Sequence, residues 1–481
     1  MTYVDLLFSL SWVQSELLLA GFALVGTLLG ALLGNRSTGL LTGAGVATLL
    51  AAGTLALLHR PDIPQDIFAG AMSIDAFGAF AKAIIAFAAA ATLVLGADHF
   101  NRLQDRQFEF PLITVAAVLG MFVMVSANDL IALYVGVELQ SLAAYVLAAW
   151  RRDDARSSEA GLKYFVLGAL SSGLLLFGCS YVYGFAGSVQ FDAIAAAAAE
   201  PGIGLIFGLV MVLAGLAFKM GAAPFHMWTP DVYEGAPTPV TALFAAAPKV
   251  AAVVLMARML YEPFAGMEQE WQQVIAVLAG ASMLVGAFAG LVQTNLKRLM
   301  AYSSIANMGF VLMALAAGAP EGAQAALIYL AVYLPATIGV FAVMMALRQR
   351  GEAIETISDL AGVGQRHVGY AALLTILFFS LAGIPPLAGF WGKFEAFHAT
   401  LGAGLAPLAV VGAIAAVVAA GYYLRVLATV WFSPAAESDV RPGSGVAATV
   451  AILGAALSFP VLLVLMTGLE QVADAAVRAS F

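Results

Sequence analysis

The chain has 481 residues, of which 62% are hydrophobic and only 10% charged, and its formal net charge is −8. Soluble globular domains carry about 25% charged residues, so this composition excludes a mostly water-facing surface and indicates a polytopic all-α membrane protein. The thinly spread acidic charge also argues against nucleic-acid binding. The single cysteine, Cys179, excludes an intrachain disulfide, a Cys-ligated zinc site and a protein-held iron–sulfur cluster.

Apolar runs separated by polar residues, glycine or proline predict about fourteen membrane-spanning helices, because each span needs about 20 apolar residues. The first run precedes the first basic residue, Arg36, so we expect a retained helix rather than a cleaved secretory signal. In chain order the predicted helices are 16–34, 39–58, 75–97, 110–126, 128–149, 159–183, 201–223, 236–260, 271–293, 299–317, 322–347, 369–398, 404–432 and 446–468.

Basic residues are distributed unequally between the loops on the two sides of the predicted bundle. Cytoplasmic loops of membrane proteins carry the excess of lysine and arginine, so both termini should face away from the cytoplasm, which agrees with an even number of spans. One side holds Arg36, Arg102, Arg106, Arg151, Arg152, Arg156, Lys297, Arg298, Arg348, Arg350, Arg366 and Arg441, and the other holds only Arg60, Arg258 and Arg478.

The fourth to eighth and the ninth to thirteenth helices form two predicted repeats of five. Each repeat has a break in its fourth helix (helices seven and twelve of the chain), at 219–224 and at 383–386, where proline removes a backbone donor. Five helices per repeat place the two in opposite orientations, and inverted repeats with paired broken helices are typical of transporters. The predicted division is an N-terminal three-helix segment 1–109, a first repeat 110–260, a second repeat 261–432 and a C-terminal helix 433–481.

Five of the six lysines lie within predicted apolar helices, whereas nearly all arginines lie in loops or at helix ends. A buried lysine can lose its proton and an arginine cannot, so this distribution favours titration over fixed charge. Lys249 is central in its predicted helix, which favours a functional role. Lys82 and Lys163 lie near helix ends, where snorkelling to the interface is an equal alternative. The remaining two are Lys219 and Lys393.

Glu138 is the one acidic residue near the middle of a predicted helix, so we expect it to be protonated or to have a cationic partner. A structural ion pair is the alternative, but one acid cannot pair with four or five lysines, which favours a proton relay. His226 follows the first break directly. It is predicted either to shuttle protons between lysines or to cap the broken helix.

Several motifs, which together cover most of residues 110–400, carry a family resemblance. They are Tyr-Val-Gly-Val-Glu-Leu-Gln-Ser at 134–141, Glu-Ala-Gly-Leu-Lys-Tyr-Phe at 159–165, Phe-Lys-Met-Gly-Ala-Ala-Pro-Phe-His-Met-Trp at 218–228, Pro-Asp-Val-Tyr-Glu-Gly-Ala-Pro-Thr-Pro-Val-Thr at 230–241, Ala-Pro-Lys at 247–249, Lys-Arg-Leu-Met-Ala-Tyr-Ser-Ser-Ile-Ala at 297–306 and Leu-Ala-Gly-Ile-Pro-Pro-Leu-Ala-Gly-Phe-Trp-Gly-Lys-Phe at 381–394. In these segments the chain resembles the antiporter-like subunits of respiratory complex I, the proton-pumping NADH:quinone oxidoreductase, and above all the subunit N type, called subunit 2 in mitochondria.

The resemblance implies fourteen helices in two inverted repeats and assigns roles to single residues. It implies that Glu138 and Lys219 form the pair on helices five and seven, that Lys249 is the central relay, and that Lys393 is the lysine of helix twelve. A lysine at 393 distinguishes the chain from the M type, which has glutamate there, and an end at 481 distinguishes it from the L type, which continues into a long lateral helix. Asn307 stands where the family often has histidine, which weakens a relay through a titratable group in the tenth helix.

The function implied is proton translocation by a membrane-arm subunit of a translocating oxidoreductase, driven by quinone reduction elsewhere in the complex. We expect no cofactor in this chain, with flavin, iron–sulfur clusters, NADH and quinone in partner subunits. The expected partners are other membrane-arm subunits, especially the K-type and M-type neighbours, and the lipid bilayer. The expected location is the bacterial inner membrane with periplasmic termini, rather than the mitochondrial inner membrane.

Two alternatives remain open from the sequence. One is a subunit of a multisubunit cation/proton antiporter built from the same module, and the other is a non-pumping structural spacer whose lysines tolerate neutral replacement. If the chain pumps, we expect protons to leave near Lys393, since Glu395 and His398 follow it toward the outer end of the helix.

Overall fold

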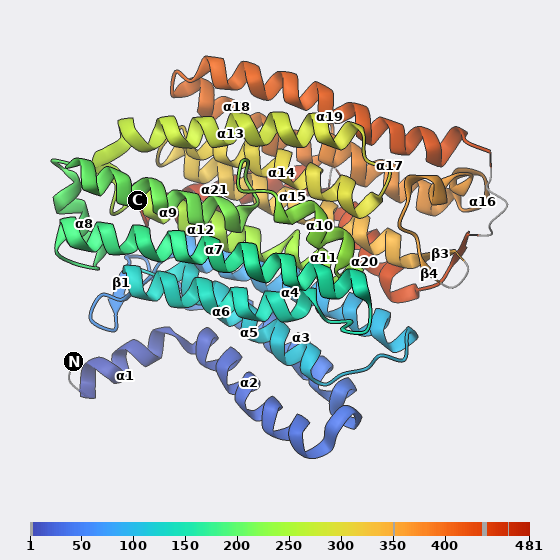
Figure 1. The fold of residues 1–481 in the computed structure, drawn as a ribbon, viewed down its shortest axis with the longest axis horizontal. Coiled ribbons are helices and arrows are strands. Elements are labelled where there is room, and N and C mark those ends of the chain that lie inside the picture. Colours follow the sequence, from blue (N-terminus) through green and yellow to red (C-terminus); the bar gives the residue numbers. More distant parts are fainter. Residues whose placement is uncertain (1–2, 350–351, 435–439, 460) are drawn as a thin grey trace.

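The computed structural model describes residues 3–349, 352–434, 440–459 and 461–481. Its long helices run along the longest axis of the molecule and form a single bundle (Figure 1). Within the described ranges, eleven segments are long and apolar enough to cross a membrane, and one of them, Gln14–Leu58, contains two successive helices. The chain is therefore a multi-pass membrane protein, as its composition predicts.

The helices follow one another with short connections. The N-terminal segment contains α1 (Tyr3–Trp12), α2 (Gln14–Leu33), α3 (Thr38–Leu58) and α4 (Ala76–Arg102). The next elements are α5 (Glu109–Ser126), α6 (Leu130–Ala148), α7 (Ala155–Ala186), α8 (Phe191–Ala198), α9 (Ile203–Met220), α10 (Trp228–Gly235), α11 (Thr238–Phe244) and α12 (Ala247–Tyr261). They are followed by α13 (Glu268–Leu291), α14 (Leu296–Leu315), α15 (Glu321–Ala346), α16 (Val363–Arg366), α17 (Val368–Ala382), α18 (Ala388–Gly402), α19 (Ala406–Phe432), α20 (Gly445–Leu457) and α21 (Val461–Arg478).

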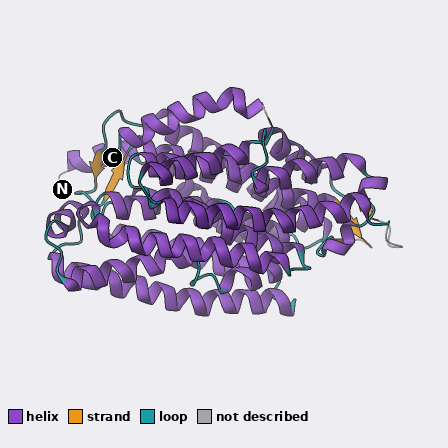
Figure 2. Ribbon diagram, turned by 90° about the horizontal axis from the view of Figure 1, so that it is seen from above, coloured by secondary structure: helices purple, strands orange, loops and turns teal. Residues whose placement is uncertain are grey.

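Two small antiparallel sheets lie at opposite ends of the bundle (Figure 2). At one end β1 (Gln65–Ile67) pairs with β2 (Met72–Ile74), and at the other β3 (Leu347–Gln349) lies between β4 (Glu352–Ala353) and β5 (Val440–Pro442). The strands β3 and β5 carry basic residues predicted for the cytoplasmic side. Both termini lie at the end that holds β1 and β2 (Figures 1 and 2), so they share one side of the bundle, opposite these basic residues.

The two halves begin with the same close helix crossing. A Cβ atom on Gly120 of α5 would lie 2.4 Å from the backbone nitrogen of Gln140 on α6, and one on Gly286 of α13 would lie 2.4 Å from that of Ala306 on α14. Small residues let membrane helices approach this closely. The shared contact supports the expected repetition of a five-helix unit.

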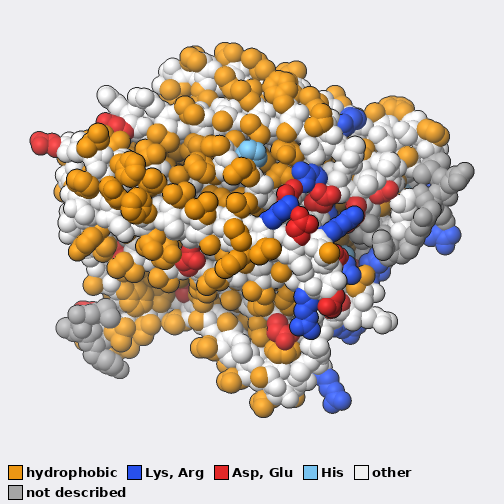
Figure 3. Space-filling model, viewed as in Figure 1, with side chains coloured by type: hydrophobic (Ala, Val, Ile, Leu, Met, Phe, Trp, Pro, Cys, Tyr) orange, Lys and Arg blue, Asp and Glu red, His pale blue; other side chains and the backbone are white. Residues whose placement is uncertain are grey.

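The centre of the bundle is formed by α12, α14 and α15, whose side chains are nearly all buried. By contrast, α2, α7 and α19 expose many large apolar side chains, as expected for helices that face lipid. Figure 3 shows hydrophobic side chains over most of one face, with charged side chains gathered toward the end that holds β3 and β4.

Every predicted span coincides with one or two helices, and both predicted breaks are present. Two further interruptions were not predicted. The span 236–260 divides into α11 and α12, because Pro248 in the first turn of α12 needs no hydrogen-bonded N–H there and favours a helix start. The span 446–468 divides into α20, which ends at Leu457, and α21, which begins at Val461, so residues 433–481 contain more than one helix.

Candidate functional site

The first break lies between α9 and α10. The helix α9 ends at Met220, and Gly221 follows with φ +72°, a left-handed conformation that favours glycine. Lys219, in the last turn of α9, is buried, and its Nζ donates a hydrogen bond of 2.7 Å to Ser141 Oγ on α6. The ammonium also lies 5.9 Å from the centre of the Tyr145 ring, an aromatic contact that favours a cation.

Glu138 lies three residues before Ser141 on α6, so the two side chains share one face of the helix. Its Oε1 is buried and has no hydrogen-bond partner in the described residues. The ion pairs within 4 Å in the described part of the chain do not include Glu138 with Lys219. The expected pair is thus apart in this structure, with the lysine held by the neighbouring serine.

Lys249 lies in the first turn of α12 rather than at the centre of an unbroken helix, and only 1% of it is exposed. Its Nζ donates a hydrogen bond of 2.8 Å to the backbone oxygen of Met220, the last residue of α9. Carbonyl groups at a helix C-terminus lack helical donors and carry partial negative charge. The ammonium of Lys249 therefore caps the helix end created by the first break.

The second break lies between α17 and α18 and has the same form. The helix α17 ends at Ala382, and Gly383 follows with φ +82°. Lys393, buried on α18, donates from Nζ to the backbone oxygens of Leu381 at 3.1 Å and Ala382 at 2.9 Å. A second buried ammonium thus caps the second broken helix.

A chain of buried polar groups leads away from Lys393 into the bundle. A small cavity of about 10 Å³ lies beside Lys393, Asn307 and Tyr329, which is room for about one water molecule. The Tyr329 hydroxyl donates to Asn307 Oδ1 at 2.7 Å, and Asn307 Nδ2 donates to the Ser303 backbone oxygen at 2.7 Å. Ser303 Oγ in turn lies 2.6 Å from the Tyr423 hydroxyl. The position often occupied by histidine in the family is therefore part of a neutral hydrogen-bonded chain.

A second set of buried hydroxyls lies between the two halves. Tyr233 of α10 and Tyr333 of α15 both interact with Ser304 of α14, and Tyr333 also interacts with Thr337. All four side chains are buried or nearly so, and no well-aligned hydrogen bond satisfies their hydroxyls within the described residues. These groups were not predicted from the sequence, because hydroxyls scattered over three helices give no spacing signal.

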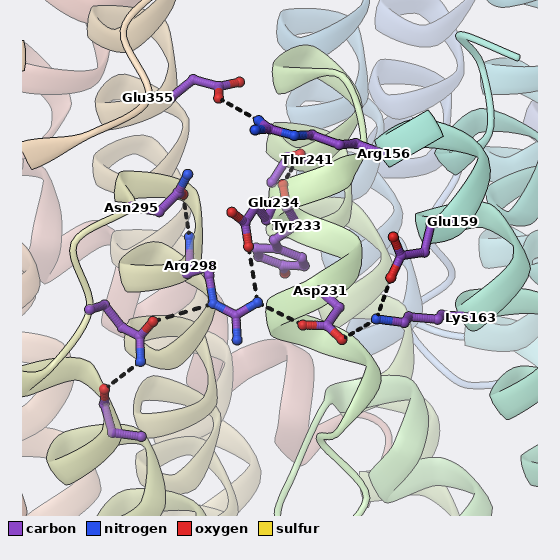
Figure 4. A network of polar contacts seen from close by, with 12 residues as sticks. Arg156, Glu159, Lys163, Asp231, Tyr233, Glu234, Thr241, Asn295, Arg298 and Glu355 are labelled. Carbon is purple, nitrogen blue, oxygen red and sulfur yellow. Dashed lines mark hydrogen bonds and ion pairs between the residues drawn. The ribbon is translucent and has the colours of Figure 1, made fainter. Parts of the chain in front are cut away.

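Lys163 belongs to a network of charged side chains at the end that holds β3 and β4 (Figure 4). Its Nζ lies 2.7 Å from Asp231 Oδ2 and 2.8 Å from Glu159 Oε1, and Arg298 Nη1 lies 2.6 Å from Asp231 Oδ1. Arg298 also contacts Glu234 at 3.0 Å. The network joins α7, α10 and α14 beside a cavity of about 230 Å³. The sequence signal for this network was Glu159, an acidic residue four positions before Lys163 on the same helix.

Lys82 has a partner that the sequence did not predict. So do Arg258 and Lys297, which were expected in loops but are buried in helices. Lys82 Nζ lies 2.5 Å from Glu16 Oε1, and both side chains are buried. Arg258 is buried inside α12, where Nη2 lies 2.6 Å from Asp75 Oδ2. Lys297 is buried in α14, where its Nζ donates to the Ala236 backbone oxygen at 3.1 Å and lies 3.4 Å from Glu355 Oε1. These contacts leave Lys219, Lys249 and Lys393 as the buried lysines with no carboxylate within 4 Å in the described residues.

His226 lies in the turn between α9 and α10 and is half-buried, with a buried Nδ1 that has no partner among the described residues. Its backbone oxygen, not its ring, accepts the hydrogen bond from Thr229 N near the start of α10. A shuttle role for the ring stays a prediction. In the described ranges, no group of three histidine, cysteine or acidic side chains is placed to hold a metal ion.

Comparison with known proteins identifies the family of this fold. Residues 127–419 match the family model described as NADH:quinone oxidoreductase/Mrp antiporter, transmembrane. The NADH-quinone oxidoreductase subunit N of Rhodospirillum rubrum is 50% identical over 473 residues, which are 97% of this chain and 97% of the relative. The chain belongs to the subunit N family of NADH-quinone oxidoreductase.

A further relative and two solved structures match over nearly the whole length of the chain. The subunit N of Hirschia baltica is 46% identical over 98% of this chain and 100% of its own. A chain of respiratory complex I from Thermus thermophilus with bound aureothin has a TM-score of 0.82 and 33% identity, covering 96% of this chain and 100% of that one. A chain of the Mrp complex from Dietzia sp. DQ12-45-1b has a TM-score of 0.85 and covers 99% of this chain and 98% of that one. Because its sequence is only 21% identical, it shows the fold alone.

Proposed function

We propose that this subunit N family member translocates protons in the membrane arm of NADH-quinone oxidoreductase, coupled to quinone reduction in other subunits. The observation that carries the proposal is the pair of buried ammonium groups, Lys249 and Lys393, each bound to the carbonyl end of a broken helix. The chain then acts as part of an enzyme, with flavin, iron–sulfur clusters, NADH and quinone held by partner subunits. The M-type and K-type membrane subunits are its proposed neighbours.

The geometry of each break suits a group that gains and loses a proton. Burial among apolar side chains disfavours a charged ammonium, whereas the partial negative charge of the helix-end carbonyls favours it. The two effects oppose each other, so a small movement of the broken helix changes which protonation state of the lysine is preferred. Breaks are also the places where a membrane helix bends with least loss of hydrogen bonds.

Glu138 and Lys219 act as the switch in this proposal. In the arrangement described here Lys219 is bound to Ser141, and Glu138 Oε1 has no partner among the described residues. When the carboxylate approaches, Lys219 holds its proton more tightly, and when it withdraws the proton is released toward Lys249. A serine three residues from the acid gives the ammonium a resting partner during that exchange.

The proposed path runs from the charged network of Figure 4 to the opposite end of the bundle. Protons enter beside Lys163 and Asp231, load Lys249, and pass along the buried hydroxyls around Ser304 and Tyr333 toward Asn307 and Tyr329. They leave through Lys393. Since Asn307 does not titrate, transfer past it relies on the Tyr329 hydroxyl and on water in the adjoining cavity.

The membrane orientation follows from the basic end of the bundle. That end is proposed to face the cytoplasm, because basic loops are retained there, so both termini face the periplasm of a bacterial inner membrane. The outer end of α18, with Glu395 and His398, then opens on the side where protons are released.

The two other functions are less well supported. A cation/proton antiporter is not favoured, because full-length relatives about 50% identical are named subunit N and the Mrp complex is similar in fold alone. A passive spacer does not require three buried lysines that lack a carboxylate partner in the described part of the chain, since unpaired buried charge is destabilising.

Co-purification tests the proposal most directly. The chain is tagged at one terminus, extracted in mild detergent and isolated, and its partners are identified by mass spectrometry. We expect the NADH-oxidising and quinone-reducing subunits together with NADH:quinone reductase activity. Recovery of antiporter subunits without any redox subunit would replace the proposal by the antiporter alternative.

A further inference from the structure

A continuous groove runs along the outside of α3, α4, α15 and α20. It consists of two cavities, of about 650 Å³ and about 470 Å³, which share Val46, Val94 and Val446. The larger cavity is lined almost entirely by apolar side chains, and Leu50, Phe87 and Leu453 expose 43%, 42% and 57% of their surface there. The groove therefore offers an apolar channel open to the membrane.

The apolar cavity has the depth of one leaflet. Its lining runs from Ile84 to Val94 on α4 and from Val446 to Leu457 on α20. At 1.5 Å per residue these stretches are about 15 Å and 16 Å long, and the hydrocarbon core of a bilayer is about 30 Å thick. A helix of a partner subunit would need an apolar groove as long as the whole hydrocarbon core, whereas this cavity is about half that length, which matches an acyl chain better.

The second cavity continues from Val94 to the basic end of the bundle and is lined by Asp98, Gln107 and Arg106. Asp98 is already bound by Arg102, at 3.1 Å, and by the Ser444 hydroxyl, at 2.5 Å. The exposed guanidinium of Arg106 therefore adds positive charge to a site whose acid is already neutralised. Basic pockets between membrane helices on the cytoplasmic side suit anionic lipid headgroups.

We propose that this groove binds one anionic diacyl phospholipid, with its headgroup at Arg106 and its acyl chains between α3 and α20. The inference rests on the proposed membrane orientation for the cytoplasmic position of the headgroup. The site lies outside the two broken helices and their lysines, so its test does not depend on proton translocation.

Two glycines make the groove easy to block. Gly39 and Gly43 of α3 line the headgroup cavity, and a Cβ atom on either would meet nothing within 4 Å. A phenylalanine side chain at 43 would thus start in open space beside the cavity that it is meant to fill. Gly173, exposed on α7 and equally free of neighbours, provides a matched control on another lipid-facing helix.

The experiment adds a diazirine-bearing phosphatidylglycerol to the complex purified with this chain and maps the labelled peptides after illumination. We expect label on α3 and α20 in the parent and in Gly173→Phe, and its loss in Gly43→Phe to the level seen with excess unlabelled phosphatidylglycerol. Arg106→Gln should lower labelling about fivefold, while labelling by the matching phosphatidylcholine probe stays unchanged. Equal labelling of Gly43→Phe and Gly173→Phe, or labelling by both probes that is insensitive to Arg106, would overturn the site. So would cross-links from the groove to a helix of a neighbouring subunit.

Discussion

The two broken helices have the same backbone geometry at the break, but the lysine that caps each break comes from a different element. In both, a glycine with positive φ ends the first half-helix and a proline follows three residues later, at 221 and 224 and at 383 and 386. The ammonium that caps the first break comes from the next helix, at Lys249, whereas the one that caps the second comes from the resumed half of the same helix, at Lys393. The carbonyls at both broken helix ends therefore bind an ammonium, although different elements supply it.

The surroundings of the two breaks also differ. Near the first lie an acid and a base, Glu138 and Lys219, which we propose as the switch. Near the second, the polar side chains of α14 and α15 that line the cavity beside Lys393 are Asn307, Tyr329 and Tyr333, none of which is a carboxylate or an ammonium. The comparison suggests that charge is switched in the first half and relayed in the second.

The largest effect is expected from the two glycines. Gly221→Ala and Gly383→Ala each place a Cβ in a left-handed conformation, which costs about 1–2 kcal/mol, and bring it 2.8 Å from Thr229 Oγ1 or Lys393 Cδ. Both variants should lower the amount of assembled complex on native gels to a similar degree, while Gly173→Ala should not. If only one of the two variants lowers the amount of assembled complex, the left-handed glycine is not equally required for assembly at both breaks.

The next largest effect is a loss of coupled turnover, which should be greater when a charge is removed from the first half than when a neutral polar group is removed from the second. Glu138→Gln keeps the shape of the side chain and removes its charge, so we expect normal assembly and a several-fold loss of quinone-reductase turnover coupled to proton uptake. Asn307→Leu, which removes polar groups without changing charge, should cause a smaller loss. If Glu138→Gln couples as well as the parent, Glu138 and Lys219 have no switching role.

A smaller effect is expected from one hydroxyl in the second half. Tyr329→Phe removes the donor to Asn307 Oδ1, and a single hydrogen bond contributes about 1 kcal/mol. Proton pumping should slow by less than in Glu138→Gln, with little change in assembly, and Tyr370→Phe, on α17, provides the control. Pumping at the parental rate would exclude this hydroxyl from the path.

The smallest effect concerns the anchoring of α12, the helix that supplies the first cap. Glu262 follows α12, and burial, aided by Asp75 and Asp66 and opposed by Arg258, raises its pKa to about 7. Between the unfolded value of about 4.5 and pH 7 the folded state keeps a proton that the unfolded state has lost. The contribution of Glu262 to stability therefore falls as pH rises through this window.

Glu262→Gln stays uncharged and should remove that fall. The measurement is the temperature at which the complex loses this subunit, taken at several pH values from about 5 to about 8. We expect the advantage of Glu262→Gln over the parent to grow with pH. Parallel pH profiles would mean that Glu262 does not change charge in this window.

Much of the fold could be predicted because its signals are local. Within the described ranges, apolar runs located each segment that is long and apolar enough to cross a membrane, and glycine and proline located both breaks. The division of α11 from α12 had a local signal in Pro248, which the hydrophobicity of the span concealed. The division of α20 from α21 was concealed in the same way.

The site was predictable as a set of residues but not as a set of contacts. Lysines in apolar helices pointed to Lys219, Lys249 and Lys393, yet their acceptors are a serine and backbone carbonyls that no sequence pattern identifies. Lys82 and Glu16 are 66 positions apart, and their pairing depends on how α2 packs near α4. Contacts of this kind are set by tertiary packing, which sequence spacing does not report.

The measurement that tests the central claim is proton translocation per NADH oxidised in membrane vesicles carrying Lys249→Arg or Lys393→Arg. Arginine keeps the positive charge and can still donate to the helix-end carbonyls, but it does not release its proton. Met256→Ala, a buried neutral change on α12, provides the control for packing. We predict that both arginine variants assemble and fail to pump, while Met256→Ala pumps. Normal pumping by the arginine variants would show that these lysines only cap the broken helices, and would contradict the account.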